Sequence, residues 1–233
     1  PTSSNLETKF NNANVKIRVF DSTGADISSG TIIYIKDGKA LVATCAHAFR
    51  TSAGKGNMEI DLSATSGEEK IQGNLIAYDL TKDIGLIWIT LPQNAQVEVV
   101  SVAPDGTFIK KDDEVYTAGC SGGEACTVKK GKVSSTNRYL GPNNVQVTPP
   151  PVGGRSGGGL FNCKGQLIGI CSAADPSLNE GLYITAGELR NYLKQNNLDY
   201  AIPQSQQRPS PQTPSTTSPA GTLFSQGLFL VAS

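Results

Sequence analysis

The sequence predicts an all-β protein, built as a barrel or a sandwich, with one short helix near residue 186. Runs of β-branched and other apolar residues recur along the chain with turn residues between them. The 25 glycines and 13 prolines predict many turns and few long helices. Helical periodicity of the apolar residues occurs only near residue 186.

The first half of the chain contains six strand-like runs. The first, at residues 15–20, alternates apolar and polar side chains and is followed by a turn at 21–24. The others are expected at residues 28–35, 39–44, 58–62, 71–78 and 84–89.

The second half contains further short runs and then the helix. Strands are expected at residues 114–118, 126–133, 144–147, 160–161 and 166–171. Thr185 and Glu188 have the spacing of a capping box, and Leu189, Tyr192 and Leu193 follow at helical spacing. We therefore expect a helix at about 186–196, packed against this second half.

The ends of the chain differ in composition from the domain at residues 14–200. Residues 1–13 are polar and are expected to be loose. Residues 203–222 are rich in Pro, Ser, Thr and Gln, which is typical of a linker. The apolar tail at 223–233 could dock on the domain or begin a further unit.

The charge balance gives no sign of a nucleic-acid or anionic-membrane partner. The formal net charge is zero, and the one basic cluster, residues 129–132, is expected to be a solvated hairpin. No apolar run approaches the ~20 residues of a membrane span, so membrane contact is expected only as a tether through the C-terminal linker.

The cysteines and the histidine limit the redox and metal chemistry. Five cysteines leave at least one thiol that is free or that pairs outside the chain. Cys120 and Cys126 flank a loop short enough to be closed by a disulfide. With one histidine and no Cys-x-x-Cys pair, neither a metal site nor a cofactor is expected.

Three residues together indicate nucleophilic catalysis. His47 ends one apolar strand, Asp83 precedes another, and Ser156 lies in the glycine-rich segment 152–161. Each alone has an ordinary structural explanation, as a core histidine, a turn carboxylate or a surface loop. In the order His, Asp, Ser they supply a base, a group that orients the base, and a hydroxyl to activate. The Gly-x-Ser-x-Gly pattern of α/β-hydrolases requires a later histidine, which this chain lacks.

Three sequence blocks resemble the chymotrypsin/trypsin-like serine peptidases. Residues 44–47 (Thr-Cys-Ala-His), 83–86 (Asp-Ile-Gly-Leu) and 154–158 (Gly-Arg-Ser-Gly-Gly) resemble that family's Thr-Ala-Ala-His, Asp-Ile-Ala-Leu and Gly-Asp-Ser-Gly-Gly. The compact spacing resembles the bacterial Deg-type branch. The stretches at 138–142 and 154–161 resemble trypsin-like domains of planctomycete bacteria.

The resemblance, which covers about residues 14–196, implies a fold and a set of roles. It implies two six-stranded antiparallel β-barrels, at about 14–95 and 97–185, followed by the short C-terminal helix. Ser156 would be the nucleophile, His47 the general base and Asp83 its orienting partner. The N–H groups of Gly154 and Ser156 would form the oxyanion hole. Ser172 would support Asp83, and the substrate would be bound by Ser172, Ala173, Ala174 and Gly181.

Two departures from the family pattern affect activation and specificity. Arg155 replaces the acidic residue that forms the buried ion pair of activated trypsins, so no N-terminal activation cleavage is expected. The base of the specificity pocket falls at Pro150 and Pro151, with Gly181 at its wall. Since no acid lies at the base, a small or apolar residue is expected before the cleaved bond.

The sequence therefore predicts a serine endopeptidase that acts on peptides or proteins through an acyl-enzyme. Two alternatives remain open, a protease-like domain that binds peptides without cutting them and an esterase on the same scaffold. An extracytoplasmic location is expected, because it fits a bacterial protease that is tethered through its C-terminal linker. Cys45 and Cys171, beside the expected site, are interpreted as buried core thiols.

Overall fold

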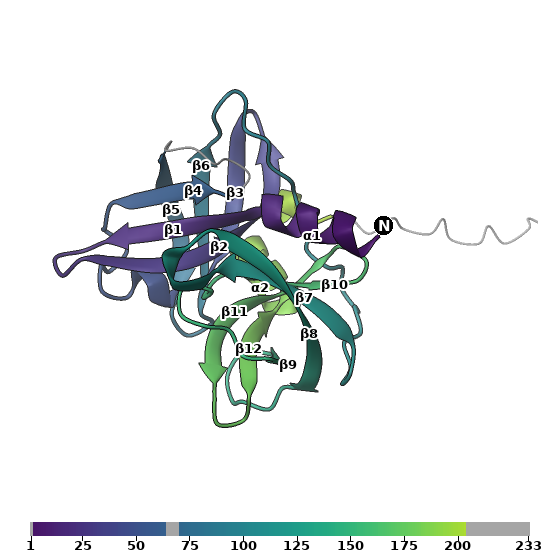
Figure 1. Ribbon diagram of the computed structural model, residues 1–233. Helices are drawn as coiled ribbons and strands as arrows, with labels where there is room; N and C mark the ends of the chain where they lie inside the picture. The colour runs from purple at the N-terminus through teal and green to yellow at the C-terminus, as the bar shows by residue number, and fades with distance from the viewer. Residues whose placement is uncertain (1, 64–69, 204–233) are drawn as a thin grey trace, which may run out of the picture. The chain divides into compact units, whose positions relative to one another are not determined.

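Two closed antiparallel β-barrels form the protein, as described by the computed structural model for residues 2–63 and 70–203 (Figure 1). In the first barrel the strand order is β1-β2-β3-β6-β5-β4. Its strands are β1 Asn14–Phe20, β2 Ala25–Lys36, β3 Lys39–Thr44, β4 Met58–Leu62, β5 Ile71–Asp79 and β6 Ile84–Thr90, with a 3-10 turn, η1, at His47–Phe49.

The second barrel has the strand order β10-β11-β12-β9-β8-β7. Its strands are β7 Glu114–Cys120, β8 Cys126–Thr136, β9 Asn144–Thr148, β10 Gly159–Asn162, β11 Leu167–Asp175 and β12 Glu180–Thr185. Two 3-10 turns, η2 Ser121–Gly123 and η3 Asp199–Ala201, and a C-terminal helix, α2 Ala186–Gln195, complete this half. The predicted fold, two six-stranded barrels and a short helix, is confirmed.

The β12 strand was not among the runs expected from sequence. It is six residues long and passes directly into α2, so its apolar residues merge with the helical pattern. The basic cluster at 129–132 lies in the β8 strand of the β7–β8 hairpin, and its three lysines are exposed, as expected for a solvated hairpin.

The apolar residues of β3 are buried on both faces of the strand. Ala40 and Val42 point into the first barrel, whereas Leu41 and Ala43 join the apolar cluster that extends into the second barrel. Successive side chains of a strand point to opposite faces, so a strand buried on both sides reads as a continuous apolar run. The packing places the C-terminal end of β3 at the junction of the barrels.

Residues 3–12 form a helix, α1 Ser3–Asn12, where the sequence suggested a loose segment. Leu6 and Phe10, four residues apart, are its buried side chains. The Phe10 ring stacks on Phe161 of β10 with ring centroids 4.2 Å apart. Two apolar residues on one face are enough to dock this otherwise polar helix, but too few to give a clear periodic signal.

The α2 helix begins and ends close to the expected bounds, with Leu189 and Leu193 fully buried. Its expected capping box is not formed, because Thr185 makes no side-chain capping bond and the Glu188 carboxylate accepts hydrogen bonds from Asn143. No helix in the described part of the chain is long and apolar enough to cross a membrane. The expected linker, apart from Pro203, and the apolar tail lie outside the described residues.

Candidate active site

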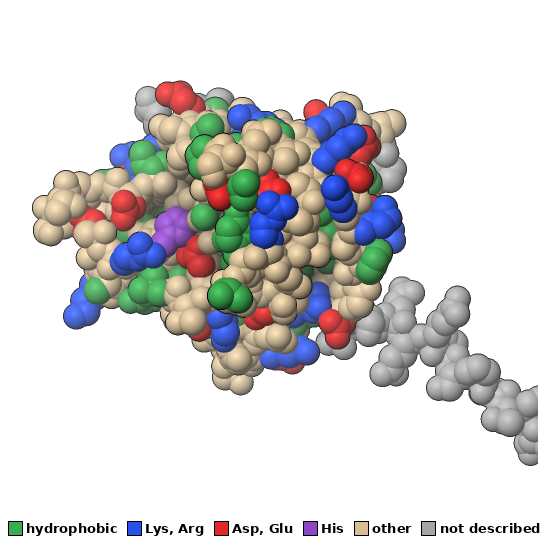
Figure 2. Space-filling model, turned by 90° about the horizontal axis from the view of Figure 1, so that it is seen from below, with side chains coloured by type: hydrophobic (Ala, Val, Ile, Leu, Met, Phe, Trp, Pro, Cys, Tyr) green, Lys and Arg blue, Asp and Glu red, His purple; other side chains and the backbone are tan. Residues whose placement is uncertain are grey.

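His47 and Asp83 are brought together by paired strands of the first barrel. Thr44, the last residue of β3, pairs with Gly85 of β6, so the segments that follow β3 and precede β6 lie side by side. His47 begins η1, three residues after β3, and Asp83 immediately precedes β6. Asp83 adopts a left-handed conformation (φ 53°), which aspartate tolerates better than most residues. Figure 2 shows the single histidine side chain at the molecular surface.

The Asp83 carboxylate is held by four groups. Its Oδ1 atom accepts hydrogen bonds from the backbone N–H groups of Ala46 (3.0 Å) and His47 (2.9 Å). Its Oδ2 atom lies 2.9 Å from His47 Nδ1 and accepts a 2.5 Å bond from Ser172 Oγ. Burial disfavours the charged carboxylate, but the bonds from His47 and Ser172 outweigh it and lower the pKa of Asp83.

The second ring nitrogen of His47 faces a thiol. Nε2 lies 3.6 Å from Cys45 Sγ, and no hydrogen bond joins Nε2 to Ser156 among the described residues. The bond to Asp83, followed by the contact with Cys45, raises the pKa of His47 to about 10 against the opposing effect of burial. With Nδ1 protonated toward Asp83, a neutral His47 carries its lone pair on Nε2.

Ser156 lies in a loop that is hydrogen-bonded to both barrels. We call residues 153–158 the nucleophile loop, after the role expected of Ser156. Gly157 N–H donates to Cys171 O (2.7 Å), next to Ser172, and Ser156 O accepts from Ser29 N–H (2.7 Å) of the first barrel. A Cβ on Gly157 would collide with Thr44 Oγ1, so the loop passes directly beside the segment that leads to His47.

Three N–H groups of the nucleophile loop, those of Gly153, Gly154 and Ser156, have no acceptor among the described residues. Gly154 and Ser156 are the two that were expected at the oxyanion hole. The carbonyls of the same peptide groups are bound elsewhere, because Gly153 O accepts from Gly122 N–H (2.8 Å) and Arg155 O from Gly158 N–H (3.0 Å). Since the carbonyl and N–H of a peptide group point in opposite directions, these bonds fix where the free N–H groups point.

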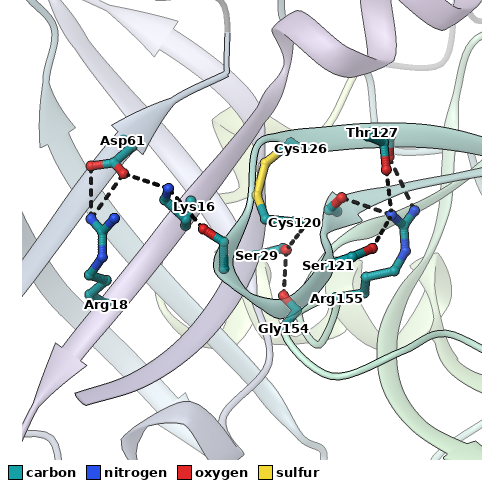
Figure 3. Close-up of a disulfide and its surroundings, with 12 residues drawn as sticks. Lys16, Arg18, Ser29, Asp61, Cys120, Ser121, Cys126, Thr127, Gly154 and Arg155 are labelled. Carbon is teal, nitrogen blue, oxygen red and sulfur yellow. Dashed lines mark hydrogen bonds and ion pairs between the residues drawn. A yellow bond between two sulfur atoms is a disulfide. The ribbon is translucent and has the colours of Figure 1, made fainter. Parts of the chain in front are cut away.

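Arg155 is buried between the β7 and β8 strands, with 2 % of its surface exposed. Its guanidinium donates to the carbonyls of Gly119 (2.8 Å), Thr117 (3.0 Å) and Thr127 (3.2 Å), as Figure 3 shows in part. No carboxylate pairs with it among the described residues. Burial lowers the pKa of Arg155, and carbonyl dipoles rather than an ion pair hold the cation.

The β7–β8 hairpin around Arg155 is closed by a disulfide between Cys120 and Cys126, which are paired residues of the two strands. Cys45, Cys163 and Cys171 are free. Burial raises the pKa of the Cys171 thiol to about 12, so it stays protonated at neutral pH.

The other expected substrate-binding residues lie on β11 and β12. The strand pairing is interrupted at Ser172 and resumes with Ala173 opposite Leu182 and Ala174 opposite Gly181. Ala173 and Ala174 are exposed, whereas Gly181 is buried. A Cβ on Gly181 would collide with the ring of Pro151, so this proline closes the space beside Gly181.

Two residues that contact the site were not singled out as site residues from sequence. Cys45 had been interpreted as an ordinary core thiol, and Ser29 had no assigned role. Ser29 is distant in sequence from the loop it binds, so only the fold brings them together. In the described part of the chain, no group of three His, Cys, Asp or Glu side chains could hold a metal ion.

Comparison with known proteins identifies relatives of this chain. Its residues 28–170 match the family described as "Trypsin-like peptidase domain". Two "Serine protease Do-like HtrA" proteins of Lactococcus lactis, from subspecies lactis and cremoris, are each 26 % identical over 165 residues. Each alignment covers 66 % of this chain and 38 % of the relative, so the match spans well under half of the relatives' length.

Solved structures share the fold. The active form of the Rv3671c protease from M. tuberculosis superposes with a TM-score of 0.67 at 21 % identity, over 80 % of this chain and 82 % of that one. A serine endoprotease from Yersinia pestis gives a TM-score of 0.68 at 20 % identity, over 86 % and 68 %. The family match covers more than half of the sequence, and the chain belongs to the trypsin-like peptidase family.

Proposed function

We propose that the protein is a serine endopeptidase with Ser156 as nucleophile, His47 as general base and Asp83 as the group that orients the imidazole. One observation carries the proposal. The Asp83–His47 pair leaves a basic Nε2 near a loop that holds a serine and the free N–H groups of Gly154 and Ser156. These are the parts that acyl transfer requires.

Each part has a step in the reaction. Ser156 Oγ attacks the peptide carbonyl while His47 Nε2 takes the hydroxyl proton, and the carbonyl oxygen becomes an oxyanion. The free N–H groups of Gly154 and Ser156 stabilise that oxyanion, at about 2.7–4 kcal/mol per donor in comparable sites. His47 then gives the proton to the leaving amine, and water attacks the acyl-enzyme by the same path.

The substrate is proposed to be an extended peptide that lies along the exposed residues Ala173 and Ala174. Backbone hydrogen bonding at a strand edge suits an extended peptide of varied sequence. The Pro151 ring against Gly181 leaves room for only a small side chain before the cleaved bond. Glu180, the acid that precedes Gly181 in β12, is buried and pairs with Arg138 at 3.1 Å. It is therefore not available to bind the Lys or Arg side chain of a substrate.

One observation favours a second candidate, a protease-like domain that binds peptides without cutting them. His47 Nε2 contacts Cys45 Sγ instead of the Ser156 hydroxyl. Catalytic hydrogen bonds are often long without substrate and shorten when it binds, so the contact does not remove the first candidate. Hydrolysis of fluorescently labelled casein that is lost in Ser156→Ala supports the peptidase, whereas casein binding without any cleavage supports the second candidate.

An extracytoplasmic location remains a proposal. The Cys120–Cys126 disulfide supports it, because disulfides persist in oxidising compartments. The esterase alternative and the likeness to planctomycete proteins remain predictions. Fast turnover of p-nitrophenyl esters with no cleavage of casein would favour an esterase.

A further inference from the structure

Ser29, in the β2 strand of the first barrel, is completely buried and uses all of its polar groups. Its carbonyl accepts a bond from Thr44 Oγ1 (2.6 Å) within the first barrel. Its other contacts reach the second half of the chain. The N–H donates to Ser156 O (2.7 Å), and Oγ donates to Gly154 O (2.8 Å) while accepting from Cys120 N–H (2.8 Å; Figure 3).

The two carbonyls bound by Ser29 belong to Gly154 and Ser156, the two residues whose free N–H groups are proposed to form the oxyanion hole. Fixing Gly154 O sets the direction of the peptide group that follows Gly154, and fixing Ser156 O does the same after Ser156. The segment between them, which carries the nucleophilic hydroxyl, is therefore held at both ends. If it rotated, a carbonyl could turn toward the oxyanion position and repel the negative charge.

The nucleophile loop packs closely against Ser29 and the end of β7. A Cβ on Gly119 would lie 3.1 Å from Ser29 Oγ and 3.2 Å from Arg155 Cα, which is tighter than ordinary contact. A Cβ on Gly154 would collide with Cys120 O. The nucleophile loop therefore packs against Ser29 on one side and against the backbone of Gly119 and Cys120 of β7 on the other.

We propose that Ser29 is a positioning residue for the nucleophile loop, acting through Gly154 and Ser156 without touching the substrate. The inference rests on the proposed peptidase function. Complete loss of one oxyanion donor costs about 10²–10³ in kcat. Loosening two donors that remain in place should cost less, so Ser29→Ala is expected to lower kcat about 10- to 100-fold. Since substrate binding does not involve Ser29, KM should change less than about threefold.

The adjacent serine provides a matched control. Ser28 lies in the same strand and is also buried (2 % exposed), but its hydroxyl has no partner among the described residues. Ser28→Ala removes the same atom from the same strand without touching the nucleophile loop. It is expected to keep wild-type kcat and KM.

The experiment compares wild type, Ser29→Ala, Ser28→Ala and Ser156→Ala by two readouts. These are the acylation rate with p-nitrophenyl acetate and the rate of covalent labelling by a fluorophosphonate. For Ser29→Ala both rates should fall about 10- to 100-fold, by the same factor from pH 6 to pH 9, because no titrating group has changed. If it fails to fold by near-UV circular dichroism, Ser29→Cys, which keeps the volume and a weak donor, should lose about three- to tenfold.

The outcomes separate the two claims. If wild type is labelled at Ser156 and Ser29→Ala reacts at the wild-type rate, the role of Ser29 is wrong and the peptidase proposal stands. If Ser28→Ala slows as much as Ser29→Ala, general loosening of β2 explains the effect and the inference also fails. If wild type neither reacts nor labels, the proposed function is overturned and the inference with it.

Discussion

Cys45 Sγ lies 3.6 Å from His47 Nε2, the atom proposed to accept the proton of Ser156. The thiol occupies the position where the family's block has alanine, and it is completely buried. A sulfur atom this close to Nε2 occupies the place that the Ser156 hydroxyl would need, so the contact must be given up before His47 can act as a base. The barrel that places His47 beside Asp83 therefore also places a competing group at its other nitrogen.

We predict that Cys45→Ala raises the acylation rate about two- to tenfold. A single hydrogen bond is worth about 0.5–1.5 kcal/mol net, and 1.4 kcal/mol corresponds to a factor of ten in rate. The measurement is the fluorophosphonate labelling rate at neutral pH. Cys163→Ala, which removes an exposed free thiol outside the site, is the control and should leave the rate unchanged. A Cys45→Ala variant slower than wild type would show that the thiol assists His47.

The raised pKa of His47 predicts an alkaline activity profile. The imidazole must be neutral to accept a proton, so kcat/KM should increase with pH well beyond 6.5, toward the value of about 10 that the bonds to Asp83 and Cys45 impose. Asp83→Asn removes the larger of these influences. It should lower the midpoint of the profile toward 6.5 and reduce kcat by about 10⁴-fold. A wild-type midpoint at or below 6.5 would contradict this account of the site.

The same shift predicts how His47 contributes to stability. Because the pKa of His47 is higher in the folded state than its unfolded value of 6.5, protonation favours folding. This contribution is complete below pH 6.5 and is lost as pH rises through about 10. Urea unfolding at pH 6 and pH 10 should show a larger loss of stability for wild type than for His47→Gln. Equal losses would show that another group is responsible.

The order of the site residues and most of the strands could be predicted from sequence, since both depend on local patterns. Alternating and continuous apolar runs marked the strands that bury one face or both, as in β3. The α1 helix was missed because only Leu6 and Phe10 are buried in a polar segment.

The contacts that complete the site could not be read from sequence for a different reason. Ser29 meets Gly154 only when the two barrels pack together, and no local pattern reports such a pairing. The partners of Arg155 are likewise mostly backbone carbonyls, which any sequence supplies. The departure at Arg155 was visible in the sequence. The carbonyls of Thr117, Gly119 and Thr127 that bind its guanidinium, here called the Arg155 socket, were not.

Arg155→Met should destabilise the fold by about 2–5 kcal/mol. The substitution removes the guanidinium donors to the buried carbonyls of Thr117 and Gly119 and to the partly buried carbonyl of Thr127, at about 1–3 kcal/mol for each group left unsatisfied. Urea denaturation measures the change. Arg155→Lys keeps the charge and some donors, so its free energy of unfolding should fall by less. A loss below about 0.5 kcal/mol for Arg155→Met would show that the Arg155 socket contributes little to stability.

The same socket predicts that activity needs no newly cut N-terminus. Arg155 fills the position of the acid that would bind such an N-terminus, and it is already held by β7 and β8. A chain that keeps residues 1–13 should be as active as one trimmed within them. Activity that appears only after trimming would contradict this prediction.

The contact between Pro151 and Gly181 predicts selection for small residues before the cleaved bond. In a peptide library, kcat/KM for Ala at this position should exceed that for Lys or Arg at least tenfold, because Pro151 fills the space beside Gly181 and Glu180 already pairs with Arg138, and about 1.4 kcal/mol gives that factor. In Pro151→Gly, larger apolar residues should also be accepted before the cleaved bond. Strong selection for Lys or Arg would refute this view of the pocket.

Covalent labelling by a fluorophosphonate, followed by identification of the modified residue by mass spectrometry, tests the central claim most directly. The reagent reacts with a serine that has an adjacent base and an oxyanion site, whatever the natural substrate. Wild type should be labelled at Ser156, and both Ser156→Ala and His47→Ala should remain unmodified. A folded wild-type chain that stays unlabelled, or labelling that persists in Ser156→Ala, would contradict the assignment of Ser156 as the nucleophile.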